Sequence, residues 1–223
     1  MKAVSLSQDS LKFKTQSHPE EVANSLSHGV AAILSIIGTA FLVALALRND
    51  KPVIDIISIA FFGIGFITVY VTSFLFHTMH IDKAKKVLQI LDHCMINIMI
   101  TGSYAPVCLG ILKGFWGYGI FAVNFICMVI GIVVNLIDAK KYYKLSQVLY
   151  IIMGWMFAVA LYPAFKAIPV PGMLLIILGG VLYTIGIPFY RMKSTKYMHF
   201  VFHMFVLFGS IPHFIFVLLY CCR

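Results

Sequence analysis

Long apolar runs constrain the fold of this chain more than any other feature of its sequence. A helix that crosses the hydrocarbon core of a bilayer needs about 20 predominantly apolar residues. Seven stretches of roughly that length follow one another, joined by short polar connections: 26–47, 53–77, 87–111, 116–137, 145–162, 172–190 and 197–220. Gly154 and Pro163 interrupt or end the fifth stretch. The pattern predicts an all-α membrane protein, a bundle of seven transmembrane helices.

The composition supports this class and argues against nucleic acid as a partner. The chain is 61% hydrophobic and 11% charged, whereas a soluble domain is usually about 45–50% apolar and about 25% charged. Its net charge of +9 is typical of a membrane protein whose basic residues flank the cytoplasmic ends of its spans. No basic run or recognition motif indicates nucleic-acid binding. We expect membrane lipid as the partner, and the oligomeric state is left open.

The distribution of Lys and Arg predicts the orientation. With seven spans, the N-terminal segment and the loops after the second, fourth and sixth spans share one side, which holds 12 of the 17 basic residues. The positive-inside rule then places the N-terminus in the cytoplasm and the C-terminus outside. We expect residues 1–22 to form a polar cytoplasmic tail and residues 23–223 a single transmembrane domain, because no connection is long enough for a second domain.

Five polar side chains are predicted to meet in the inner third of the membrane. Ser73 and His77 lie four residues apart near the inner end of the second span. Asp92 lies about 9 Å into the third span, at 1.5 Å per helical residue. His199 and His203 share one face of the first two turns of the seventh span. Ionisable groups are costly inside a membrane and mark functional sites by default.

Three converging histidines indicate a zinc site. Neutral imidazole is a good zinc ligand, and three protein ligands leave one position open for water. We therefore predict His77, His199 and His203 as ligands, Asp92 as a base or an orienting group, and Ser73 as a hydrogen-bonding group for water or substrate. Two alternatives stay open, since imidazole also suits other transition metals and a membrane histidine can simply bond to a neighbouring helix.

A further polar face precedes the first span. Glu21, Asn24 and His28 lie on one side of a helix, where they could line or cap the same site or form an interfacial stripe. His93 points about 100° away from Asp92 and is expected to be structural. Pro106, in the third span, predicts a kink.

His213 lies about 21 Å along a helix from His199, too far to share the ion. We expect it to make inter-helix hydrogen bonds.

Taken together, these stretches resemble the hemolysin III group of the progestin and adipoQ receptor (PAQR) superfamily. The motifs that carry the resemblance are ExxNxxSH at 21–28, SxxxH at 73–77, Asp92 in LDH, TGSYAP at 101–106, GGVLYTIGIPFY at 179–190 and HxxxH-x9-H from His199 to His213. The resemblance implies a seven-helix bundle and zinc held by the three predicted ligands. It also implies that Ser73 and Asp92 match the family's Ser and Asp. The related alkaline ceramidases share this constellation and hydrolyse a lipid amide with zinc.

The function we expect is therefore metal-dependent hydrolysis of a lipid amide or ester, in a bacterial plasma (inner) membrane. Two other functions stay open: a pore-forming cytolysin of the hemolysin III type, and a non-enzymatic sensor or receptor with structural zinc. A transporter is disfavoured because the sequence shows no inverted repeat or broken midplane helix. The substrate is left open, as is whether Asp92 contacts the metal directly or through water.

Overall fold

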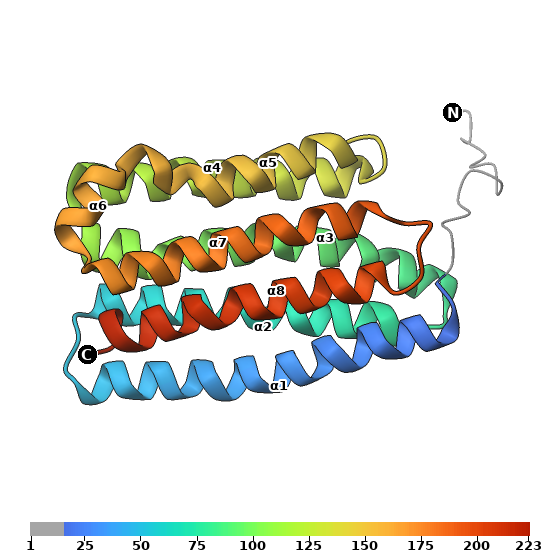
Figure 1. The fold of residues 1–223 in the computed structure, drawn as a ribbon, viewed down its shortest axis with the longest axis horizontal. Coiled ribbons are helices and arrows are strands. Elements are labelled where there is room, and N and C mark those ends of the chain that lie inside the picture. Colours follow the sequence, from blue (N-terminus) through green and yellow to red (C-terminus); the bar gives the residue numbers. More distant parts are fainter. Residues whose placement is uncertain (1–15) are drawn as a thin grey trace, which may run out of the picture.

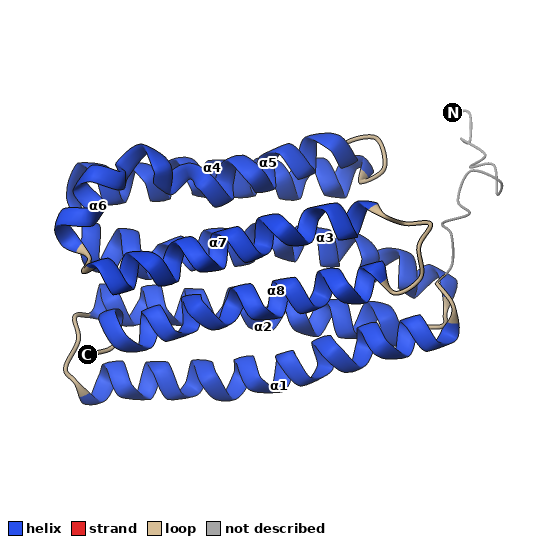
Figure 2. Cartoon of the chain, viewed as in Figure 1, coloured by secondary structure: helices blue, strands red, loops and turns tan. Residues whose placement is uncertain are grey.

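The chain forms a bundle of seven helical segments that are long and apolar enough to cross a membrane (Figure 1). The computed structural model describes residues 16–223, so residues 1–15 of the expected tail lie outside the described part. Within that part no strand is present (Figure 2). The predicted fold class is confirmed, whereas the orientation relative to the cytoplasm stays a prediction.

Four of the membrane segments are single helices and three change their helical geometry. The single helices are α1 (His18–Arg48), α2 (Val53–Thr78), α4 (Gly114–Asp138) and α7 (Val170–Arg191). The composite segments are α3 (Asp82–Ala105) with the π-helix η2 (Pro106–Leu112), α5 (Tyr143–Trp155) with the 3-10 helix η3 (Met156–Ala160) and α6 (Leu161–Ala167), and α8 (Met198–Phe216) with the π-helix η4 (Val217–Cys221).

One end of the bundle, which we call the basic end, holds the start of α1 and the connections 79–81, 139–142 and 192–197. The C-terminus lies at the opposite end (Figure 1). Nine of the described Lys and Arg residues lie at or next to the basic end and five at the other. The charge asymmetry seen in the sequence is therefore an asymmetry of the folded bundle.

Prolines explain the changes of helical geometry in two segments. Pro106 has no backbone N–H and its ring crowds the preceding turn, and the third segment passes into a π-helix at this residue, where we expected a kink. In the fifth segment the 3-10 turn ends one helix and starts another, so Pro163 falls in the first turn of α6. Proline is tolerated in a first turn, and the helix continues to Ala167 rather than ending at Tyr162 as expected.

The start of α1 is tied to the start of α8. Oε2 of Glu20 accepts hydrogen bonds from the backbone N and the hydroxyl of Ser17, at 2.9 and 2.6 Å. Its other oxygen accepts one from the backbone N of Tyr197, at 2.9 Å. These contacts let α1 begin at His18, before the apolar run and before residue 23, where we expected the transmembrane domain to start.

Two glycines bring α2 and α3 into close backbone contact. A Cβ atom on Gly65 would lie 2.9 Å from the Cα of Met99, and one on Gly102 would lie 2.9 Å from a main-chain oxygen of α2. Small residues allow membrane helices to approach in this way. The antiparallel register set by these contacts brings Ser73 opposite Asp92.

Candidate metal centre

Three histidines from two helices converge at the basic end. His77 lies in the last turn of α2, and His199 and His203 lie in the first two turns of α8. One ring nitrogen of each lies within 4.8 Å of the others. The ring centroids of His199 and His203 are 4.5 Å apart, and each is 5.1 Å from that of His77. The structure thus contains the expected three-histidine group, which could hold a metal ion.

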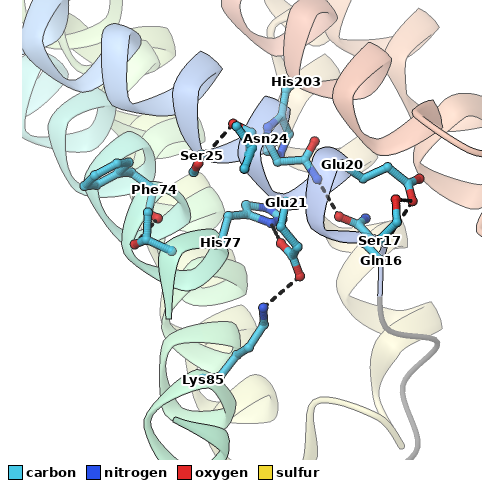
Figure 3. Close-up of polar contacts among 12 residues, drawn as sticks. Gln16, Ser17, Glu20, Glu21, Asn24, Ser25, Phe74, His77, Lys85 and His203 are labelled. Atoms are coloured by element: carbon cyan, nitrogen blue, oxygen red, sulfur yellow. Dashed lines mark hydrogen bonds and ion pairs between the residues drawn. The ribbon is translucent and has the colours of Figure 1, made fainter. Parts of the chain in front are cut away.

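Glu21 of α1 orients the first of these histidines. Its Oε2 lies 2.6 Å from Nδ1 of His77, and its Oε1 accepts a hydrogen bond from Nζ of Lys85 at 2.7 Å (Figure 3). A carboxylate only accepts hydrogen bonds, so Nδ1 carries the proton and Nε2 keeps its lone pair. This Nε2 atom is buried and, among the described residues, has no hydrogen-bond partner. A carboxylate behind a ligating histidine is the usual outer shell of a protein metal site.

The contact between Ser27, on α1, and His203 indicates which ring nitrogen of His203 carries the proton. The hydroxyl proton of Ser27 is donated to the main-chain oxygen of Asn24 at 2.8 Å. At its 3.3 Å contact with Nδ1 of His203 the hydroxyl oxygen must therefore accept. His203 is then protonated at Nδ1, like His77, and its Nε2 lone pair is also free for a metal.

The face of α1 that carries Glu21, Asn24 and His28 lies against the candidate metal centre. The ring of His28 stacks on that of His203 at a centroid distance of 3.5 Å and an interplanar angle of 11°. Both nitrogens of His28 are buried and have no hydrogen-bond partner in the described chain. Asn24 is fully buried, and its side-chain nitrogen donates to Gln16 at 2.5 Å. Of the two readings open from the sequence, the geometry favours the one in which this face lines the site.

Asp92 and Ser73 form a pair on the wall of an internal cavity. Both residues line the cavity together with His199 and His203. The Asp92 carboxylate does not belong to the group of atoms that lie within 4.8 Å of one another. Asp92 therefore lines the same cavity as His199 and His203 but is not one of the three residues that could hold the ion.

The cavity has a volume of about 200 Å³ and is enclosed mainly by α3, α5, α7 and α8. It reaches Tyr143 and Gln147 at the basic end and extends past the histidines to Val107 and His213. Since His213 follows His199 by 14 residues on one helix, the cavity follows about 21 Å of α8. Most of its wall is apolar, so it suits an acyl chain better than a hydrated solute.

Four residues near the candidate site were not singled out for it from the sequence. Ser27 and Lys85 contact site residues, as described above. We expected a structural role for His93, but it lines the cavity, where its Nε2 lies 3.1 Å from the hydroxyl of Tyr190. Tyr190 in turn packs on His199 with centroids 5.8 Å apart. Ser27 and Tyr190 lie inside the motifs quoted above, and those motifs were the one sequence signal that could have indicated a role at the site.

His213 lines the deep part of the cavity. Its ring stacks on Tyr183 with centroids 5.6 Å apart.

The donor set fits zinc. Glu21 and Ser27 contact Nδ1 of His77 and His203, which leaves the Nε2 atoms as donors. Neutral imidazole nitrogens suit zinc among other transition metals. Three protein ligands leave a coordination position free for water or substrate. The three histidines, with the Asp92 carboxyl on the same cavity wall, could therefore hold a metal ion.

Comparison with known proteins identifies close relatives. The family model described as haemolysin-III related matches residues 16–214. A "Hemolysin-3 homolog" of Bacillus subtilis (strain 168) is 36% identical over 204 residues, covering 92% of this chain and 95% of that protein. A "Hemolysin-3" of Bacillus cereus is 34% identical over 206 residues, covering 92% of this chain and 94% of that protein. No solved structure matches the chain.

Proposed function

This chain belongs to the haemolysin-III-related family of membrane proteins, and within that family we propose that it is a zinc-dependent hydrolase of a lipid amide or ester. The observation that carries the proposal is that Nδ1 of both His77 and His203 contacts a side chain of α1. Glu21 and Ser27 occupy both Nδ1 atoms, which leaves the two Nε2 lone pairs free in a group of three histidines that each have a ring nitrogen within 4.8 Å of the others. A histidine cluster with only a structural role does not need Nδ1 of both His77 and His203 to be paired with side chains of α1.

His77, His199 and His203 would hold the ion. Zinc at this position supplies Lewis acidity for a carbonyl and lowers the pKa of water. The chain itself supplies the proton chemistry: a carboxylate oxygen of Asp92 accepts the proton of the attacking water and returns it to the leaving amine or alcohol. The Ser73 hydroxyl, on the same cavity wall, would position the attacking water or the substrate by hydrogen bonding.

The substrate is a membrane lipid. The mostly apolar cavity accommodates an acyl chain along α8, with the scissile bond beside the histidines. We place this chemistry at the cytoplasmic side of a bacterial plasma membrane, because the site lies at the basic end of the bundle.

The test is the zinc content of detergent-purified protein by mass spectrometry, followed by an assay of lipid amide and ester hydrolysis. We expect about one zinc per chain, absent from His77→Ala and from His199→Ala/His203→Ala. His213→Ala is the matched control, because this histidine lies on the same helix and the same cavity but outside the cluster. Freshly purified wild-type protein without metal would overturn the proposal.

The names of the relatives favour a second candidate, pore formation by a cytolysin. Its test is dye release from liposomes by the purified wild-type protein and by His199→Ala/His203→Ala. Leakage that does not depend on the histidines would support a pore, whereas absence of leakage at high protein-to-lipid ratio would reject it.

A further inference from the structure

An exposed cationic side chain that the proposed hydrolysis does not use lies against two aromatic rings of the cavity at the basic end. Lys193 lies in the connection between α7 and α8. Its Nζ atom lies 4.4 Å from the ring centroid of Tyr143 and 5.7 Å from that of Tyr190. Both rings line the cavity, so the ammonium group stands where the cavity reaches the basic end.

Within the described part of the chain, no carboxylate forms an ion pair with Lys193. Among residues 16–223, lysines form ion pairs with carboxylates at Lys85–Glu21 and Lys113–Asp55. Lys193 instead rests on two aromatic faces, which stabilise a cation by their quadrupole. Partial burial lowers the pKa of Lys193 below its ordinary value of 10.5. An anionic group at this position would offset that burial.

The position of the lysine also relates it to the histidines. Tyr190 connects the two, because its ring lies 5.7 Å from Nζ of Lys193 and 5.8 Å from the ring of His199. A lipid with its acyl chain deep in the cavity and its carbonyl at the histidines would therefore extend its head group toward Lys193.

We propose that Lys193 is a specificity-determining residue, which binds the negatively charged head group, carboxylate or phosphate, of a single-chain lipid whose acyl chain fills the cavity. The position of the scissile bond rests on the proposed function, whereas the preference for an anionic head group does not. The inference selects acylated amino acids and lysophospholipid-like molecules over neutral lipid amides.

The experiment compares two fluorescent lipid amides of matched length, N-(cis-parinaroyl)glycine with a carboxylate and N-(cis-parinaroyl)ethanolamine without charge. Trp155 lines the cavity, and the chain has only two tryptophans. A Trp116→Phe background therefore leaves one donor, at the exposed rim of the cavity. The part of the energy transfer from Trp155 to either probe in lipid nanodiscs that saturates and is displaced by unlabelled lipid then reports occupancy of the cavity, as distinct from probe dissolved in the bilayer.

We expect the glycine conjugate to bind about tenfold more tightly than the ethanolamine conjugate, as one charge-assisted contact allows. Lys193→Gln should remove this preference without changing the binding of the neutral probe, which also shows that the variant is folded. Lys193→Arg should retain the preference. Lys86→Gln, which removes one exposed charge at the same end of the bundle, should leave the preference unchanged and thereby controls for general attraction to a basic surface.

Equal binding of the two probes to the parent protein overturns the inference, as does a preference that survives in Lys193→Gln. The same titration in His199→Ala/His203→Ala separates the two proposals. A preference retained there belongs to Lys193 whatever the fate of the zinc proposal, whereas a preference lost there belongs to the metal centre and overturns the assignment to Lys193.

Displacement by unlabelled N-oleoylglycine or by lysophosphatidic acid identifies carboxylate or phosphate as the better head group, and displacement by neither overturns the inference.

Discussion

Glu21 of α1 and His77 of α2 are 56 residues apart in the chain, and the atoms Oε2 and Nδ1 of their side chains are 2.6 Å apart in the structure. This contact occupies Nδ1 of His77 and leaves its buried Nε2 without a hydrogen-bond partner among the described residues. Lys85 bonds to the other carboxylate oxygen and so keeps Glu21 in its charged, accepting form. One helix thus supplies the ligand and another supplies its orientation.

Replacing Glu21 with Ala is therefore expected to weaken metal binding without removing a ligand. Loss of an outer-shell partner of a ligating histidine usually lowers metal affinity about 10- to 100-fold. Competition with a chelator of known zinc affinity measures the change. Glu20→Ala is the matched control, because Glu20 bonds to Ser17 and Tyr197 rather than to a histidine. Equal affinity of the Glu21 variant and wild type would contradict the orienting role.

His28 distinguishes an open catalytic site from a closed structural one. If it acts only by stacking on His203, then His28→Phe keeps the aromatic contact and should retain about one zinc per chain. His28→Ala should bind zinc somewhat more weakly, since the packing behind His203 is lost. Zinc analysis of both variants decides the matter. Loss of zinc in His28→Phe as complete as in His199→Ala/His203→Ala would make His28 a fourth ligand and favour the structural-zinc sensor.

Asp92→Asn should separate catalysis from metal binding. The amide keeps the size of the side chain but cannot accept a proton as a base, so we expect lipid hydrolysis to fall about 10²- to 10⁴-fold with the zinc content unchanged. Asp82→Asn, in the exposed first turn of the same helix, should leave the rate as it is. A loss of zinc together with activity in Asp92→Asn would instead show that Asp92 ligates the metal.

Gly65→Ala tests the register between α2 and α3. Its Cβ atom would lie 2.9 Å from the Cα of Met99, and backbone cannot yield as a flexible side chain does. We expect a loss of about 1–3 kcal/mol of stability, seen as a lower melting temperature in detergent, and a weaker Ser73–Asp92 contact. Gly119→Ala adds the same methyl group where no atom lies within 4 Å. If the two variants melt alike, the close approach does not determine the register.

Much of the candidate site could be predicted from local pattern and the number of spans. Once seven spans are counted, the C-terminal end of α2 and the N-terminal end of α8 must lie on the same side of the membrane. A spacing of four residues places His199 and His203 on one face of α8. The role of Glu21 was left open, because its contact with His77 depends on how α1 turns about its axis when it packs. His93 was expected to be structural because of its angle from Asp92 on the helix. That angle does not show how wide the cavity between the four helices is, so it could not predict that His93 lines the cavity.

By itself the sequence determined the helical class, the positions of the spans and the charge asymmetry between the two ends, because the length and polarity of each run decide these locally. Only the tertiary structure decided which nitrogen of His77 and His203 contacts α1, and that Lys193 lies against two aromatic rings of an apolar cavity. Those facts depend on contacts among α1, α2, α7 and α8, where side chains distant in sequence meet at hydrogen-bonding distance, and no periodicity within one helix encodes them.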